Sequence, residues 1–266
     1  MEEIVKYVEN EKLKLKKEIE SLKVIPLLAI IQINQNDASN TYVKGKIKDL
    51  EEVGLKYKHY SLPIETNENE VLSLINKLNN DNEVTGIIVQ LPLPKGISEE
   101  KIKYSISPLK DADGFHPLSK IDPATPKGIL NYLKDNNFEF KGKNAVVLGR
   151  SNIVGKPLQE LLLKEDMNVT ILHSKTNLID RDYYLKHADL IVSAVGKINT
   201  ITHNDNLKKD SILIDVGINR DENNKLIGDI ERNLDVAFQS PVPKGVGLLT
   251  RLQLLKNLME LYKNGI

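Results

Sequence analysis

The stretch NAVVLGRSNIVGKPLQELLLKE, residues 144–165, contains the change of pattern that decides the fold. Residues 144–148 form a short, mostly apolar run typical of a buried strand, and residues 156–165 carry leucines at helical spacing. A turn bounded by Gly149 and Gly155 joins them. A strand that passes through a glycine turn into a helix opens a βαβ unit, so the stretch predicts a parallel sheet covered by helices.

The alternation continues on the C-terminal side of this stretch. Short apolar runs at 169–173, 189–195 and 212–216 predict three further strands. Runs without a polar face are typical of strands that are buried on both sides of a doubly wound sheet. We therefore expect residues 123–247 to form a Rossmann-type α/β domain.

The N-terminal part alternates as well. A charged surface helix is predicted over 2–22, and further helices over 39–54 and 67–78. Ser39 is expected to be the N-cap of the second helix, and Gly54 suits its C-terminal end. Strands are predicted at 26–33, 57–62 and 86–90. The prolines of Leu91-Pro92-Leu93-Pro94 end the last of these, because proline cannot continue a central ladder.

A boundary between two domains is expected near residue 122. Thr125 and Pro126 are typical of the N-cap and first residue of a new helix. An apolar-periodic helix over 248–262 is expected to return and pack on the first domain. The chain is thus predicted to be a two-domain α/β protein, with one domain from residues 1–122 plus 248–266 and the other from 123–247.

Composition excludes several classes of function. The 266 residues contain 37 basic and 37 acidic side chains, so no global positive charge favours nucleic acid. The absence of cysteine excludes disulfides, thiolate metal sites and a cysteine nucleophile. We find no long apolar run and no signal-peptide pattern, and we expect a soluble cytoplasmic protein that does not bind membranes.

The glycine turn predicts a dinucleotide site. Its position between strand and helix lets backbone N–H groups and the helix N-terminus meet a pyrophosphate, and Gly149, Arg150 and Ser151 are the candidate contacts. The next strand ends in 173–176, HSKT, without the acid that would bind an NAD ribose. Cationic and hydroxyl donors suit a 2′-phosphate, so NADP is the expected cofactor. The alternatives are a tight turn without a ligand and ordinary surface charges at Arg150 and Lys175.

Two more strand ends are candidates for the nicotinamide side of such a site. Gly196 follows one strand and residues 215–219, DVGIN, follow the next, where ligands bind in doubly wound sheets. Glycines that only allow tight strand exits explain them equally well.

The loop 111–117, DADGFHP, carries two aspartates and a histidine. Asp111 and Asp113 lack the partner motif of a metal site, and we expect none. A single loop aspartate, Asp113, suits a hydrogen bond to a heterocyclic amine. For His116 we expect local packing or capping.

Tyr42 and Lys46 lie one helical turn apart, so they share a helix face. An amine beside a phenol in a poorly hydrated site is able to carry a proton, because burial lowers the pKa of lysine. Spacing alone favours the alternative of a solvated surface lysine.

Together these residues resemble the bifunctional methylenetetrahydrofolate dehydrogenase/methenyltetrahydrofolate cyclohydrolase family of one-carbon metabolism. The resemblance covers nearly the whole chain, and it is carried by Ser39, 42–46 (YVKGK), 51–54 (EEVG), 86–94 (GIIVQLPLP), 111–117, 125–128 (TPKG), 149–157 (GRSNIVGKP), 215–219 and 241–243 (PVP). The family's PVPGGVGPMT signature appears as PVPKGVGLLT at 241–250, with Lys244 in a glycine position.

The resemblance implies roles for individual residues. Lys46 matches the acid/base lysine, Gln90 the glutamine that orients it, Tyr42 the flanking tyrosine and Asp113 the pterin-binding aspartate. The NADP contacts are matched by Gly149, Arg150, Ser151, Ser174 and Ile218.

The resemblance also implies an activity. It is the oxidation of 5,10-methylenetetrahydrofolate with NADP+ followed by hydrolysis to 10-formyltetrahydrofolate, in a homodimer. The alternatives are an enzyme that retains one of the two activities and a non-enzymatic folate- or NADP-binding protein.

Overall fold

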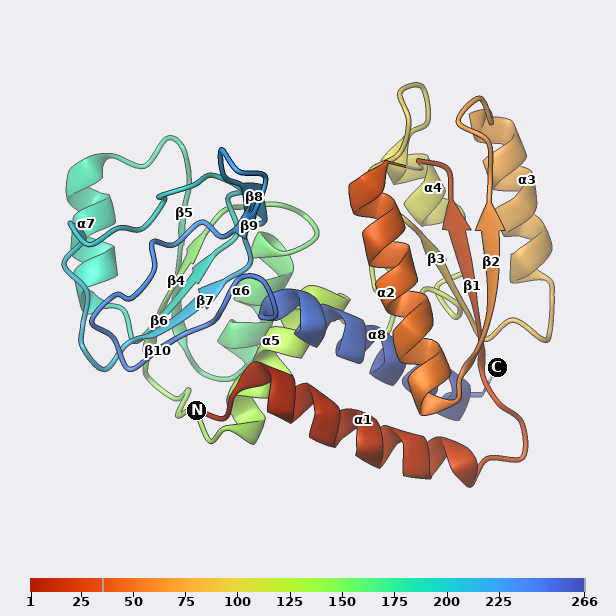
Figure 1. Ribbon diagram of the computed structural model, residues 1–266, viewed down its shortest axis with the longest axis horizontal. Coiled ribbons are helices and arrows are strands. Elements are labelled where there is room, and N and C mark those ends of the chain that lie inside the picture. The colour runs from red at the N-terminus through yellow and green to blue at the C-terminus, as the bar shows by residue number, and fades with distance from the viewer. Residues whose placement is uncertain (35, 266) are drawn as a thin grey trace. The chain divides into compact units, whose positions relative to one another are not determined.

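The computed structural model describes residues 1–34 and 36–265, which form two compact units (Figure 1). Unit 1 comprises Met1–Val8 and Thr125–Thr250, and unit 2 comprises Glu9–Ala124 and Arg251–Ile266. Each unit has a parallel sheet with helices on both faces, which confirms the predicted α/β class. No helix in the described part of the chain is long and apolar enough to span a bilayer.

The sheet of unit 2 has three parallel strands in the order β2-β1-β3. The elements in chain order are most of α1 (Ile4–Glu20), β1 (Leu27–Gln32), α2 (Asp37–Val53), β2 (Lys56–Ser61), α3 (Glu68–Asn79), β3 (Gly86–Val89) and α4 (Glu99–Ser105). Most of the C-terminal helix α8 (Val246–Lys263) also belongs to this unit. Each connection between strands contains a helix, as parallel pairing requires.

Both faces of this small sheet are buried. Leu28 and Ile30 pack with residues of α1, α2 and α8, whereas Ala29 and Ile31 pack with α3 and α4. This alternation explains why β1 is a continuous apolar run in the sequence. Leu254 and Leu258 of α8 belong to the first cluster, which confirms that the C-terminal helix returns to this unit.

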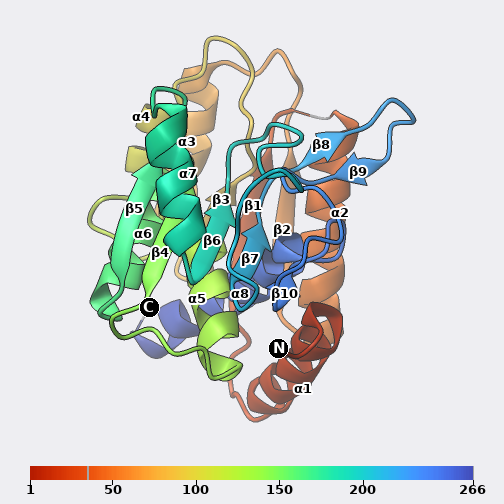
Figure 2. The ribbon, with the colours of Figure 1, turned by 90° about the vertical axis from the view of Figure 1, so that its left-hand side faces the viewer.

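The main sheet of unit 1 has five parallel strands in the order β10-β7-β6-β4-β5 (Figure 2). Its elements are α5 (Ala124–Asp135), β4 (Asn144–Leu148), α6 (Gly155–Lys164), β5 (Asn168–Leu172), α7 (Leu178–His187), β6 (Leu190–Ser193), β7 (Ile212–Asp215), the hairpin β8 (Asn219–Arg220) and β9 (Leu226–Ile227), and β10 (Phe238–Gln239). The clusters of buried residues place α5 and α6 on one face and α7 on the other. From β4 the chain moves outward to β5 and then crosses back to β6, so the strand order reverses beside β4, which is where doubly wound sheets bind ligands.

Two predicted helix starts are wrong. Helix α2 begins at Asp37, and its N-cap is Asn36, whose side chain accepts a hydrogen bond from the Ser39 amide at 2.8 Å. Ser39 therefore lies in the first turn. Helix α5 begins at Ala124, one residue before the predicted cap, and the Thr125 hydroxyl lies 2.9 Å from the Thr250 hydroxyl.

Candidate active site

Helix α2 presents Tyr42 and Lys46 because its two ends and its buried face are fixed. Asn36 caps its start, and Gly54 ends it in the left-handed region at φ 88°. Val43 and Leu50 are buried in the core of unit 2, which sets the rotation of the helix. Tyr42 and Lys46 lie one turn apart on the helix face next to the one that carries Val43 and Leu50, and both side chains are partly buried.

The Lys46 ammonium group meets the side chain of Gln90, which follows β3. The Nζ of Lys46 donates to Oε1 of Gln90 at 3.2 Å. Gln90 is fixed because its Nε2 donates to the Leu91 carbonyl at 2.7 Å and its backbone N–H donates to the Ile31 carbonyl at 2.8 Å. The side-chain oxygen Oε1 of Gln90 therefore remains to accept the hydrogen bond from Lys46. Sequence spacing predicted the shared face of Tyr42 and Lys46, the family resemblance implied Gln90 as the partner of Lys46, and the structure brings these two side chains within hydrogen-bond distance.

The loop after residue 110 is organised by Asp111. Its carboxylate accepts from the Gly114 N–H at 3.0 Å and from the His116 N–H at 2.7 Å. Gly114 has φ 74°, and a Cβ there would lie 2.6 Å from the Ile121 carbonyl oxygen, so the loop requires glycine at this position. His116 accepts from the Leu118 N–H at 3.0 Å, which is the local capping expected of it. Asp113, the other aspartate of residues 111–117, takes no part in these hydrogen bonds to loop amides.

Burial and mutual charge set the protonation of this group of side chains. Burial lowers the pKa of Lys46, and the negative charge of Asp113 opposes that shift. Burial raises the pKa of Asp113 to about 6, against the opposing charge of Lys46. Burial also raises the pKa of Tyr42, although the positive charge of Arg251 opposes it. A lysine with a lowered pKa and an aspartate with a raised one, each acting on the charge of the other, are suited to acid–base chemistry.

The turn after β4 is as tight as its glycines suggested. Gly149 has φ 113°, and a Cβ on it would lie 2.5 Å from the Ala194 carbonyl oxygen at the end of β6. A Cβ on Gly155 would lie 2.2 Å from the Gly149 carbonyl oxygen. The Ser151 hydroxyl accepts from the amides of Val154 and Gly155 at 3.2 and 3.3 Å, so it supports the start of α6. The strand, turn and helix are therefore packed against each other through backbone.

A cavity of about 700 Å³ opens at the carboxyl ends of β4, β5 and β6. Its lining includes the predicted residues Gly149, Arg150, Ser151 and Ser174, together with His173, Thr176, Arg181, Ala194, Val195, Lys197, Asn199 and Thr200. Among the described residues that line it there is no Asp or Glu, whereas Arg150, Arg181 and Lys197 are basic. Ile218, also a predicted cofactor contact, is 50% exposed after β7 and lies outside this lining.

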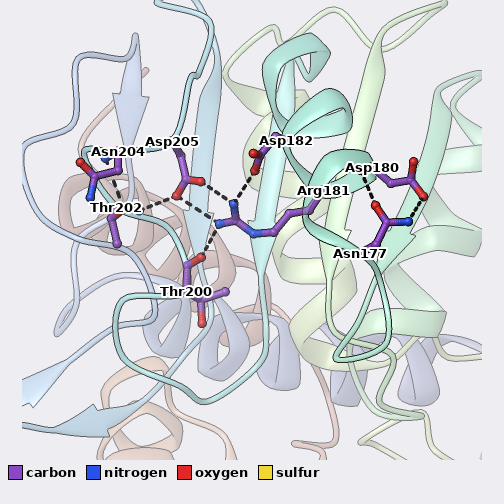
Figure 3. A network of polar contacts seen from close by, with 8 residues as sticks. All are labelled: Asn177, Asp180, Arg181, Asp182, Thr200, Thr202, Asn204 and Asp205. Atoms are coloured by element: carbon purple, nitrogen blue, oxygen red, sulfur yellow. Dashed lines mark hydrogen bonds and ion pairs between the residues drawn. The ribbon is translucent and has the colours of Figure 1, made fainter.

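Arg181 of α7 was not among the predicted site residues, and its charge is already engaged (Figure 3). Its guanidinium group donates to both carboxylate oxygens of Asp205 at 2.5 and 3.1 Å, and to the Thr200 carbonyl at 2.7 Å. The same Asp205 accepts from the Thr202 amide at 2.8 Å. Arg181 thus ties α7 to the segment that forms one wall of the cavity, and Arg150 and Lys197 remain as its other basic groups.

The backbone amides expected to face a nicotinamide have a different partner. The N–H groups of Val195, Gly196 and Lys197, just after β6, all donate to the carboxylate of Asp229. Asp229 was not predicted, because it follows a two-residue strand that has no recognisable pattern. What this segment offers to a ligand is therefore its side chains and carbonyl groups.

Fold and sites together define a class: an α/β protein that combines a Rossmann-type unit with a parallel-sheet unit carrying a buried lysine–glutamine pair. The family model described as tetrahydrofolate dehydrogenase/cyclohydrolase, catalytic domain, matches residues 2–113, and the NAD(P)-binding domain of the same family matches residues 123–265. The chain belongs to the tetrahydrofolate dehydrogenase/cyclohydrolase family, and the resemblance inferred from the sequence is confirmed.

Relatives and solved structures agree with this assignment. The bifunctional protein FolD of Bacillus cytotoxicus is 44% identical over 267 residues, which cover 95% of this chain and 92% of that protein. The FolD crystal structure from Campylobacter jejuni is 40% identical with a TM-score of 0.93, covering 98% of this chain and 97% of that one. The Trypanosoma brucei enzyme, complexed with NADP cofactor and inhibitor, is 30% identical with a TM-score of 0.91, covering 97% and 95% of the two chains.

Proposed function

We propose that this protein oxidises 5,10-methylenetetrahydrofolate to 5,10-methenyltetrahydrofolate with NADP+ and then hydrolyses the product to 10-formyltetrahydrofolate. The observation that carries the proposal is the hydrogen bond between Lys46 and Gln90, in a setting where burial lowers the lysine pKa and the charge of Asp113 opposes that shift. Family membership limits the substrate to a folate carrying a one-carbon unit.

The folate would be held by Asp113 and Tyr42. A carboxylate accepts hydrogen bonds from the amino group and ring N–H of a pterin, and with its pKa near 6 Asp113 is mostly ionised at neutral pH. The ring of Tyr42 is partly buried one turn from Lys46, where it is able to stack on the pterin. The two side chains would orient the one-carbon unit toward the lysine.

Lys46 would serve the hydrolytic step. Water attack on the cationic methenyl carbon needs a base for the water proton and an acid for the leaving nitrogen. A fully charged lysine repels that cation, and burial shifts Lys46 toward its neutral form. Gln90 Oε1 holds the amine in place without adding a charge.

The cavity in unit 1 fits an NADP cofactor. The close backbone approach at Gly149 and the basic lining suit a pyrophosphate. Arg150 and Ser174, with no acid beside them in the lining, suit a 2′-phosphate better than a 2′-hydroxyl. When bound, NADP+ supplies a hydride acceptor. We propose Ile218 as a further contact, in keeping with the family resemblance.

The remaining expectations belong to the same proposal. We propose a homodimer in the cytoplasm that binds neither nucleic acid nor membrane, in line with the balance of 37 basic and 37 acidic residues. For the domains we propose residues 1–122 plus 248–266 as the folate-binding domain and 123–247 as the NADP-binding domain.

A spectrophotometric assay of the purified protein tests the proposal. We expect NADP+ reduction with methylenetetrahydrofolate, slower reduction of NAD+, and separate hydrolysis of methenyltetrahydrofolate without any cofactor. Loss of one rate alone would indicate an enzyme with a single activity. Loss of both, with folate and NADPH still bound, would indicate a binding protein and would refute the proposed function.

A further inference from the structure

The segment between β6 and β7 supplies one wall of the cavity in unit 1. Ala194, Val195, Lys197, Asn199 and Thr200 all line it. The segment has no regular secondary structure, so its shape depends on the partners of its backbone groups.

Those partners converge on one residue, Asp229, which is buried and follows β9. Its Oδ2 accepts from the Ser193 hydroxyl at 2.9 Å, the Val195 amide at 2.8 Å and the Gly196 amide at 3.1 Å. Its Oδ1 accepts from the Lys197 amide at 2.9 Å and from Nδ2 of Asn219 at 3.0 Å. Its backbone carbonyl accepts from the Thr200 amide at 2.7 Å. Both ends of the wall are therefore tied to the same residue.

Three successive amides that point at one carboxylate form a nest, with Gly196 in the left-handed region at φ 72°. A nest on a cavity wall is a common site for a ligand anion, yet this nest is filled by the protein's own carboxylate. It therefore shapes the wall and does not bind a phosphate of the ligand.

The residues at the end of β7, the strand beside β6, pack closely against the same carboxylate. A Cβ on Gly217, just after β7, would lie 2.0 Å from Oδ1 of Asp229. Asp215 at the end of β7 in turn accepts from the Asp229 amide at 2.9 Å and from the Ile230 amide at 3.0 Å. Asp215, at the end of β7, thus fixes the backbone of Asp229, and the carboxylate of Asp229 fixes the segment that follows β6.

We propose that Asp229 is a positioning residue for cofactor binding, which fixes residues 195–200 as a preformed wall of the cavity through its carboxylate and its carbonyl. This inference rests on the proposed function, because it takes the ligand of that cavity to be NADP. It places no contact between Asp229 and the ligand.

The test is the variant Asp229→Asn. An amide has the size of the carboxylate, but it places an NH2 group opposite two or three existing donors, so the wall loses its anchor. We expect the Kd for NADPH, followed by its fluorescence, to rise about tenfold or more, since hydrogen bonds to a charged group are the strong ones. Amide exchange in residues 195–197 of the cofactor-free protein is expected to accelerate. Hydrolysis of methenyltetrahydrofolate, which uses no cofactor, is expected to keep its kcat and KM.

Asp221→Asn is the matched control. This carboxylate, in the β8–β9 hairpin of the same unit, also accepts from two backbone amides, those of Asn223 and Lys225, at 2.9 and 2.8 Å. It lies outside the cavity lining, and its variant is expected to bind NADPH as the wild type does. Asp229→Asn with wild-type NADPH affinity and wild-type exchange in 195–197 would overturn the inference.

Ser193→Ala decides the question if Asp229→Asn does not fold. It removes one donor and leaves the carboxylate, so a rise in Kd of about two- to threefold is expected, and an unchanged Kd would count against the role. A wild-type protein that binds no NADPH would instead contradict the proposed function, and the exchange of residues 195–197 in the variants would still show whether Asp229 holds the wall.

Discussion

Lys46 and Asp113 each reduce the cost that burial imposes on the charge of the other. The lysine pKa is lowered and the aspartate pKa raised by burial, and in each case the opposite charge opposes the shift. Burial thus disfavours the charged form of both groups, so that Asp113 changes protonation near pH 6 and the pKa of Lys46 lies below that of an exposed lysine. This coupling makes each residue a sensitive probe of the other.

Replacing Lys46 with methionine removes the amine and keeps much of the buried chain. We expect hydrolysis of methenyltetrahydrofolate to fall by about 10²-fold or more, the range for a lost general acid–base group. NADPH affinity is expected to stay unchanged, because the amine lies in unit 2 and the cavity in unit 1. Lys48→Met, on an exposed position of the same helix, is the matched control and is expected to retain activity. A Lys46→Met enzyme with normal hydrolysis would rule out the acid/base role.

Asp113→Asn is expected to stabilise the folded protein at pH 8 while it weakens folate binding. The folded-state pKa of about 6 lies above the ordinary 3.8, so the folded state binds the proton more tightly. The wild type therefore loses stability as the pH rises from 3.8 to 6, whereas asparagine does not ionise. We expect a gain on the order of 3 kcal/mol at pH 8 and little difference at pH 4, measured by urea denaturation. A gain that is equal at both pH values would contradict this explanation.

Among the elements, the β4–α6 turn depends most directly on its glycines. Gly149 and Gly142 both have positive φ, at 113° and 75°, but a Cβ on Gly149 would meet the Ala194 carbonyl oxygen at 2.5 Å, whereas a Cβ on Gly142 would meet nothing within 4 Å. We expect Gly142→Ala to cost about 1 kcal/mol of backbone strain and Gly149→Ala about 2–4 kcal/mol. Only Gly149→Ala is expected to lower NADPH affinity. Equal losses of stability, with binding retained in both variants, would show that the close approach of β6 is unimportant.

The elements that were predicted correctly carry their signal within a few consecutive residues. The β4–α6 stretch contains its apolar run, its glycines and its leucine spacing, and β1 is apolar throughout because both faces are covered. Helix α7 was missed because Leu178 and Ile179 are exposed, which leaves no apolar stripe. The Ser39 cap was wrong because Asn36, three residues earlier, is an equally good capping residue and takes the role.

The site was less predictable than the elements, because its contacts cross the sequence. Tyr42 and Lys46 share a face by local spacing, but the bond from Lys46 to Gln90 joins residues 44 positions apart. A pattern of apolar residues does not specify which strands pair, so only the family resemblance implied that Gln90 meets Lys46. Asp229 is further from any sequence signal, since the five donors to its carboxylate are Ser193 at the end of β6, the backbone amides of residues 195–197 and the side chain of Asn219.

At the scale of the whole molecule, the residues proposed to bind NADP and those proposed to bind the folate belong to different compact units. The cavity lined by Arg150 and Ser174 is formed within unit 1, and the pair of Lys46 and Gln90 lies within unit 2. Each unit has its own buried clusters on both faces of its own sheet. Local stability in such a chain is expected to respond separately to each ligand.

Hydrogen exchange with each ligand in turn measures this separation. NADPH at about 100 times its Kd is expected to add about 2.7 kcal/mol to the stability of the state that binds it, and to slow exchange in residues 149–151 and 173–176. A folate substrate analogue is expected to slow exchange in residues 42–46 and 111–116 instead. NADH serves as the control, with weaker protection at equal concentration if Arg150 and Ser174 bind a 2′-phosphate. Protection by NADPH confined to residues 42–46 and 111–116 would show that the cavity at the carboxyl ends of β4, β5 and β6 is not the cofactor site.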